Sequence, residues 1–144
     1  MARFERKFES ATVEWPTPQD LFDKLNDEFR FTTDVAATAD NAKCAHYYTE
    51  DCDGLKQNWR GVCWMNPPYG RAMVDWLKKA IRETWNGTTT VCLIPARTNT
   101  SWWHDLCQKY GEVRFVRGRP KFGGVDHGLP QPLAVVVFRG RPEL

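Results

Sequence analysis

The sequence predicts an α/β protein with one mostly parallel sheet of about six to seven strands and helices on both faces. Short runs of β-branched and apolar residues alternate along the chain with longer runs whose apolar residues recur at helical spacing. Prolines and glycines end most of these runs. The length of 144 residues suits a single ordinary domain. Such alternation is typical of sheets in which helices join parallel strands.

Apolar residues at helical spacing mark three expected helices. The first starts at Thr17-Pro18, a capping residue followed by a proline suited to the first helical position. The second ends at Asn86-Gly87 and the third at Gly111, where glycine lets the chain leave a helix. The expected helices cover about 18–29, 73–85 and 101–110.

The strands are expected at 31–36, 47–49, 61–65, 88–94, 113–116 and 133–138. The third run stops at Pro67-Pro68 and the fourth at Pro95, because proline cannot donate a hydrogen bond to a sheet. Ligands of such sheets bind outside the carboxyl ends of the strands. We therefore expect chemistry at Asp34, at Asn66 and in the turn 95–97.

Charge is distributed unevenly along the chain. Residues 1–70 hold eight Lys/Arg and twelve Asp/Glu, whereas residues 71–144 hold twelve Lys/Arg and six Asp/Glu. The pattern predicts two surfaces with different partners, the basic one facing a polyanion, unless the charges are simply scattered.

The composition argues against a membrane protein and against a metal centre. No apolar run approaches the roughly 18 residues of a membrane span, and the first ten residues lack the apolar core of a signal peptide. Five cysteines form no C-x-x-C pair, and only three histidines are present. We expect a cytoplasmic protein with reduced cysteines, no membrane partner and no bound metal.

The sequence Asn66-Pro67-Pro68-Tyr69 is the strongest functional signal. It lies between an expected strand and an expected helix, and its two prolines restrict the backbone. The Asn66 amide oxygen and a rigid peptide carbonyl can accept both hydrogens of an exocyclic amine. Tyr69 offers an aromatic face to a base drawn out of a duplex. The turn is thus suited to orient an amine for attack on a methyl donor.

Several segments in addition to this turn resemble the phage-type (Dam-like) DNA N-6-adenine methyltransferases, which depend on S-adenosylmethionine. The matching segments are Trp15-Pro16-Thr17-Pro18, Phe31 to Ala37, Asp53-Gly54-Leu55, Asn66 to Gly70, Leu93 to Thr98 and Arg117 to Phe122. The resemblance extends over most of the chain, from about Trp15 to Phe138. It implies a minimal Rossmann-like methyltransferase sheet that moves a methyl group to the N6 amine of adenine in DNA, at a short specific site.

The resemblance also implies roles for individual residues. Asn66 and the Pro67 carbonyl would accept from the target amine, Pro68 would stiffen the turn, and Tyr69 would stack on the base. Residues that would hold S-adenosylmethionine are Trp15, Thr17, Asp34, Ala36, Asp53 and Asn66. Asp34 would face the methionine ammonium and Asp53 the adenosine, although Trp15 also fits a hydrophobic staple and Asp53-Gly54 an ordinary turn.

One feature departs from the usual pattern of these enzymes. Their first motif is rich in glycine, but here Asp34 is followed by Val35-Ala36-Ala37, and the next glycine is Gly54. Alanine permits close approach of a ligand but not a positive φ at low cost. A nucleic-acid-binding relic without turnover therefore stays open as an alternative.

Basic residues give the expected contacts to double-stranded DNA. Arg114, Arg117, Arg119 and Lys121 follow one another through a strand and its exit, and we expect these like charges to lack compensating acids. They predict phosphate binding, or else an edge strand protected by charge. Arg71 and Arg97 follow two other strand ends and complete the DNA-binding set of Arg71, Arg97, Arg117, Arg119 and Lys121.

The whole chain, 1–144, is expected to be one methyltransferase domain, with 1–14 as a flexible segment and no separate target-recognition domain. Sequence specificity would then come from loops or from a homodimer on a palindromic site. A phage or prophage enzyme would work in the cytoplasm of a bacterial host. Other acceptors suit the same turn, namely adenine in RNA, the N4 amine of cytosine, or a glutamine amide.

Overall fold

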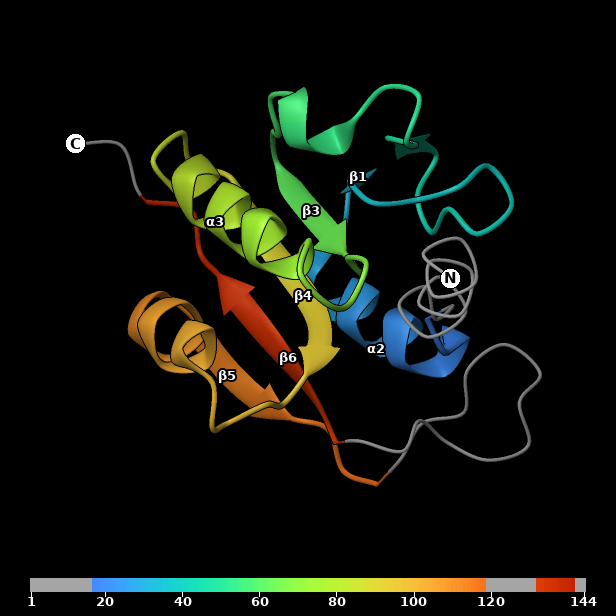
Figure 1. Ribbon diagram of the computed structural model, residues 1–144. Coiled ribbons are helices and arrows are strands. Elements are labelled where there is room, and N and C mark those ends of the chain that lie inside the picture. The colour runs from blue at the N-terminus through green and yellow to red at the C-terminus, as the bar shows by residue number, and fades with distance from the viewer. Residues whose placement is uncertain (1–16, 119–131, 142–144) are drawn as a thin grey trace, which may run out of the picture.

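The chain folds around one six-stranded mixed sheet (Figure 1). The computed structural model describes residues 17–118 and 132–141. The expected flexible segment 1–14 and the site residues Trp15, Arg119 and Lys121 therefore lie outside the described residues. The strands are β1 (Thr33–Asp34), β2 (His46–Tyr47), β3 (Val62–Met65), β4 (Thr89–Pro95), β5 (Glu112–Phe115) and β6 (Leu133–Phe138), in the spatial order β2-β1-β3-β4-β6-β5.

The strand directions confirm an α/β sheet and refine the expectation of a mostly parallel one. Strands β2, β1, β3 and β4 pair in parallel, with Asp34 opposite Trp64 and Met65 opposite Cys92. Strand β6 lies between β4 and β5 and runs antiparallel to both. Residue patterns reveal that Leu133–Phe138 is a fully buried strand, but they carry no information about its direction.

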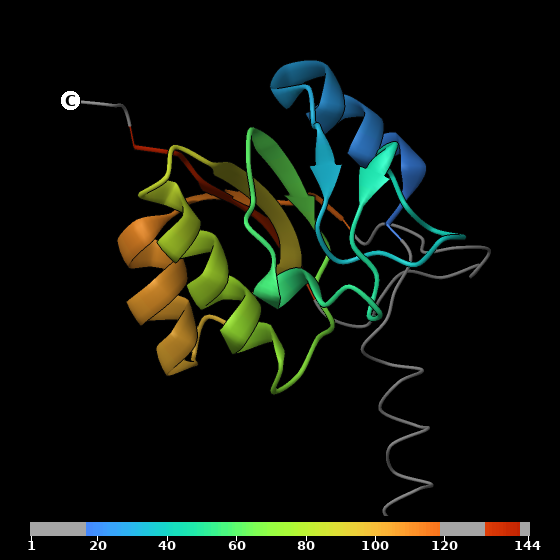
Figure 2. The same cartoon turned by 90° about the horizontal axis from the view of Figure 1, so that it is seen from above.

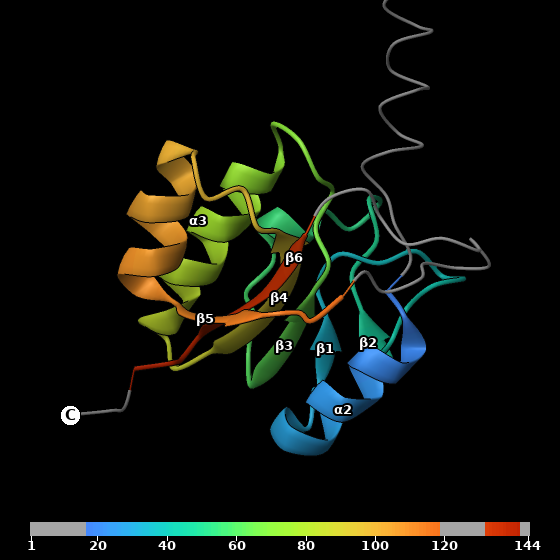
Figure 3. The same ribbon diagram turned by 90° about the horizontal axis from the view of Figure 1, so that it is seen from below.

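Helices cover both faces of the sheet, as predicted. Helix α2 (Gln19–Phe29) lies on one face, while α3 (Met73–Thr84) and the helix of residues 101–110 lie on the other (Figures 2 and 3). The middle of the last helix, Trp103–Gln108, has π-helical hydrogen bonding, which the sequence did not indicate. Trp103 is fully buried in this segment.

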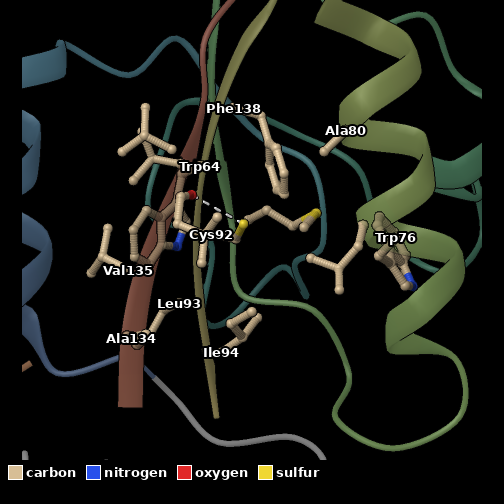
Figure 4. Packing of buried hydrophobic residues seen from close by; sticks show 14 of the residues in the cluster. Trp64, Trp76, Ala80, Cys92, Leu93, Ile94, Ala134, Val135 and Phe138 are labelled. Carbon is tan, nitrogen blue, oxygen red and sulfur yellow. Dashed lines mark hydrogen bonds between the residues drawn. The ribbon is translucent and has the colours of Figure 1, made fainter. Parts of the chain in front are cut away.

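The central strands β4 and β6 supply much of the core (Figure 4). Side chains alternate between faces: Trp64, Leu93 and Val135 point toward the α2 side, and Cys92 and Phe138 toward α3. The Cys92 thiol donates to the Val136 carbonyl oxygen over 3.2 Å, and burial raises its pKa well above the ordinary value. All five cysteines are free thiols, as expected, and three of them are buried.

Two local expectations differ from the structure. Strand β1 comprises two residues instead of the six expected at 31–36, because only Thr33 and Asp34 form ladder pairs with both neighbouring strands. Helix α2 has Pro18 at its N-cap and no side-chain capping bond, so Thr17 does not cap the helix. Within the described ranges, no helix is long and apolar enough to cross a membrane.

Candidate active site

A cavity opens at the carboxyl ends of β1, β2 and β3. The chain passes from β1 outward to β2 and then returns across β1 to β3, so the loops after β1 and β3 diverge at this point. The cavity has a volume of about 730 Å³, within the range of small-molecule sites. Seven residues expected at the site line it together, namely Thr17, Asp34, Ala36, Asp53, Asn66, Pro67 and Pro68.

The Asn66-Pro67-Pro68 turn forms one wall of this cavity. Asn66 directly follows the last residue of β3, and each proline restricts the residue before it to extended backbone. The Asn66 Nδ2 atom donates to Thr17 Oγ1 over 3.0 Å. The amide that the sequence selects for catalysis is therefore held by the residue that precedes α2.

Tyr69 is the member of the predicted catalytic set that does not line the cavity. Its side chain is 6% exposed, and its hydroxyl donates to the Leu93 carbonyl oxygen of β4 over 3.3 Å. Burial raises the pKa of this phenol above its ordinary value, so it stays protonated and can donate. The hydroxyl thus connects the Asn66-Pro67-Pro68 turn to the neighbouring strand, and stacking of the ring on a base stays a prediction.

Asp34 organises the loop between β1 and β2. Its side chain is 3% exposed and accepts hydrogen bonds from Ala36 N at 3.3 Å and Lys43 N at 3.0 Å. Burial raises the pKa of this carboxyl, while the two backbone donors act against the rise. A buried carboxylate on the cavity wall is a natural partner for a cationic group.

The absence of a glycine-rich first motif has a simple structural explanation. No residue between Asp34 and Lys43 has a positive φ, so the alanines of this loop are unstrained. The close approach that glycine allows occurs instead at Gly54, where a Cβ would lie 2.2 Å from the Val35 carbonyl oxygen. Gly54 thus lets the short helix η1 (Gly54–Lys56) pack against the end of β1.

Asp53 combines the two interpretations that the sequence left open. It has a left-handed backbone, with φ at 53°, and its Oδ1 caps η1 by accepting from Leu55 N at 3.1 Å. It also lines the cavity, with its side chain 41% exposed. The turn and the site therefore share this residue.

Several further lining residues escaped the sequence analysis. Glu50 and Asp51 are exposed acids that follow β2, and Lys43 reaches the cavity from the β1–β2 loop. The expected strand at 47–49 was a usable signal for the two acids, because the strand-end rule applies to it as well. Trp76 arrives from α3, and no local pattern connects it with the site.

Charge changes sign along this edge of the sheet. The described cavity-lining residues carry four carboxylates, on Asp34, Glu50, Asp51 and Asp53, and one ammonium group, on Lys43. Strands β3, β4 and β5 run in the same direction, and exposed Arg71, Arg97 and Arg117 follow their carboxyl ends. None of these arginines forms an ion pair with a described residue. An acidic half and a basic half thus lie side by side.

Arg114 does not belong to this basic half. Its guanidinium makes a bidentate pair with Glu28 of α2, at 2.7 and 2.8 Å, and also pairs with Glu112 at 2.9 Å. The expectation that this basic run has no compensating acids is therefore wrong for Arg114, because Glu112, two residues earlier, and Glu28, 86 residues earlier, both pair with it. No group of acids, histidines and cysteines in the described ranges could hold a metal ion.

An α/β sheet with a cavity of small-molecule size at its switch point and an Asn-Pro-Pro-Tyr turn beside that cavity is consistent with a methyltransferase-like domain. The chain belongs to the DNA N-6-adenine-methyltransferase (Dam) family, whose model matches residues 7–133.

Two relatives from bacteriophages show the extent of the similarity. The DNA N-6-adenine-methyltransferase of Escherichia phage T1 is 29% identical over 105 residues, which are 71% of this chain and 44% of that protein. The enzyme of the same name from Haemophilus phage HP1 is 30% identical over 96 residues, which are 65% of this chain and 55% of that protein. The chain spans about half the length of these curated relatives.

Proposed function

We propose that this protein transfers a methyl group from S-adenosylmethionine to the N6 amine of adenine in double-stranded DNA. The observation that carries the proposal is the meeting of Asp34 and Asn66 on one cavity at the switch point of the sheet. A site for a cationic cofactor and a site for an amine acceptor then share one wall. Membership of the Dam family supports the same activity.

The cavity residues fit the cofactor. S-adenosylmethionine supplies an electrophilic methyl group on a positively charged sulfur. Asp34, which is buried and fixed by two backbone donors, would pair with the methionine ammonium, and Ala36 leaves room beside it. Asp53 would bind the adenosine, and Glu50 and Asp51 after β2 would accept from ribose hydroxyls. Trp15 and Thr17, which precede α2, would close over the cofactor.

The Asn66 amide oxygen and the Pro67 carbonyl would hold the acceptor amine. Both hydrogens of the N6 amine donate to these oxygens, which aims the nitrogen lone pair at the methyl carbon. The new carbon–nitrogen bond forms as the carbon–sulfur bond breaks, so the bonding pair stays on sulfur and the neutral thioether leaves. Water takes the proton that the amine loses. Tyr69 would stack on the flipped base.

The basic half of the edge would bind DNA. Arg71, Arg97 and Arg117 form no ion pair within the described ranges, and they lie at the carboxyl ends of the strands, as Asn66 does. Arginines on phosphate give affinity without sequence preference and place the duplex over the cavity. Arg119 and Lys121 would extend this surface. Sequence preference would come from loops or from a homodimer in the cytoplasm of a bacterial host.

The test is transfer of labelled methyl groups to DNA, RNA and protein in separate reactions, followed by nucleoside analysis of the product. We expect N6-methyladenine in DNA, and Asn66→Ala should abolish it even at saturating cofactor, because the amide acts on the acceptor amine. Detection of N4-methylcytosine, methylated RNA or methylated glutamine instead would show that the acceptor is not adenine in DNA. A wild-type protein that fails to bind S-adenosylmethionine in calorimetry would be a relic of the fold.

A further inference from the structure

We propose that Thr17 is a positioning residue that fixes which end of the Asn66 amide faces the acceptor amine. The inference rests on the proposed function, because it concerns how Asn66 performs its role. It assigns to Thr17 a second task beside contact with the cofactor.

The first argument is the contact itself. Asn66 Nδ2 donates to Thr17 Oγ1 over 3.0 Å, across 49 residues of sequence. Thr17 is 7% exposed, and its hydroxyl is not used to cap α2. A buried hydroxyl that serves no helix therefore lies against the amide on the cavity wall.

The second argument is that both partners are held in place. Thr17 precedes Pro18 and Asn66 precedes Pro67, so both have restricted backbones. The first turn of α2 packs on β3, the strand that Asn66 directly follows, since the rings of Phe22 and Trp64 meet edge-on with their centroids 5.3 Å apart. The distance between hydroxyl and amide is thus set by the packing of α2 on β3.

The third argument concerns the chemistry of an amide. An amide has a donor end and an acceptor end, and only the oxygen can accept from the N6 amine. An Asn66 amide rotated by half a turn would place its own N–H groups against the N–H groups of the adenine amine. When Nδ2 donates to Thr17, the oxygen is the end of the amide that can accept from the amine.

A hydroxyl can donate as well as accept, so its own hydrogen must be used elsewhere for the orientation to be fixed. No described residue accepts that hydrogen, and Thr17 lines the cavity. An acceptor oxygen on the bound cofactor would take it. The Thr17 oxygen could then only accept, and the Asn66 orientation would be set when the cofactor is present.

The kinetic test compares Thr17→Val, which has the same shape without the hydroxyl, with Thr17→Ser, which keeps it. We expect the single-turnover rate at saturating cofactor and DNA to fall about tenfold or more in Thr17→Val and to stay within about threefold in Thr17→Ser. Thr90→Val is the matched control, because the Thr90 hydroxyl is buried without a partner in the described residues. It should keep the wild-type rate.

A spectroscopic test does not depend on turnover. In proton–nitrogen spectra of the labelled protein, the Asn66 side-chain amide signals should shift in Thr17→Val but not in Thr17→Ser or Thr90→Val. Unshifted signals, or a Thr17→Val rate within about twofold of wild type, would overturn the inference. Equal loss in Thr17→Ser and Thr17→Val would assign the effect to packing. A wild-type protein inactive on DNA would instead refute the proposed function, while the spectra would still report the contact.

Discussion

Gly54 packs directly on the backbone of Val35, so that a Cβ on the glycine would lie 2.2 Å from the Val35 carbonyl oxygen. The same Cβ would lie 2.9 Å from Cη2 of Trp76, and the Gly54 carbonyl oxygen accepts from Trp59 Nε1 at 2.8 Å. Gly54 therefore joins the end of β1, the helix η1 and the side of α3 beneath the cavity.

Gly54→Ala should destabilise the protein strongly, because the neighbours of the new methyl group are backbone and a large buried ring. We expect a loss of about 3 kcal/mol or more in the free energy of unfolding, measured by urea denaturation. Gly118→Ala is the matched control, since no described residue lies within 4 Å of its Cβ position and its positive φ of 76° is the unfavourable feature. That variant should lose about 1 kcal/mol. Equal losses in both variants would show that the contact with Val35 is unimportant.

Cofactor affinity should depend on the ionisation of Asp34. Burial raises the pKa of this carboxyl above its ordinary value of 3.8, and a protonated carboxyl cannot pair with an ammonium group. As the pH is lowered, calorimetry should therefore show the affinity for S-adenosylmethionine beginning to fall at a higher pH than it would if the carboxyl were that of an exposed aspartate. Asp34→Asn should bind weakly with little dependence on pH. A wild-type affinity that is constant between about pH 7 and pH 4 would contradict the pairing.

The same raised pKa has a defined effect on the free protein. The folded form holds the Asp34 proton more tightly than the unfolded chain does. The contribution of Asp34 to the free energy of unfolding should therefore increase as the pH falls from the raised pKa toward 3.8, and decrease as the pH rises through that window. Urea denaturation of the wild type and of Asp34→Asn at several pH values would measure this contribution to the free energy of unfolding.

Tyr69→Phe should separate the hydroxyl from the ring. The hydroxyl makes a buried hydrogen bond to the Leu93 carbonyl oxygen, so its removal should cost about 1 kcal/mol of unfolding free energy. If the ring stacks on the base, methyl transfer should persist in Tyr69→Phe and fall sharply in Tyr69→Ala at equal cofactor affinity. Loss of activity in Tyr69→Phe with unchanged stability would contradict a purely structural role of the hydroxyl.

Charge reversal of Arg97 and Arg117 together should weaken the interaction with DNA. If both contact phosphate, the Michaelis constant for DNA should rise and its dependence on salt should become shallower, because fewer counterions are released. Arg82→Glu is the control, since Arg82 is exposed in the last turn of α3, at the opposite edge of the sheet. An unchanged constant in the double variant would remove these arginines from the DNA surface.

The sequence predicted the order of the elements and several residues that line the cavity, because both follow from local patterns. Strand ends at Asp34 and Asn66 lie on the cavity wall, and the two prolines after Asn66 mark the turn for which a catalytic role is proposed. These signals depend on residues that are neighbours in the chain. They survive in the fold because the carboxyl ends of parallel strands meet at one edge.

Features that depend on distant residues could not be predicted in this way. Thr17 fits the pattern of a helix cap, but its partner is Asn66, 49 residues further on. The bidentate partner of Arg114 is Glu28, which lies 86 residues earlier in the chain. The direction of β6 and the π-helical turn at Trp103 likewise follow from packing rather than from any local preference.

The insertion of β6 between β4 and β5 has a consequence for synthesis on the ribosome. Among the described strands, β5 pairs only with β6, and β6 joins it to β4 through six residue pairs on the other side. While the polypeptide is still emerging, the segment Glu112–Phe115 has no neighbour to pair with, and one side of β4 stays open. The sheet can be completed only after Leu133–Phe138 has left the exit tunnel. The order of translation therefore delays completion of the core until that strand is available.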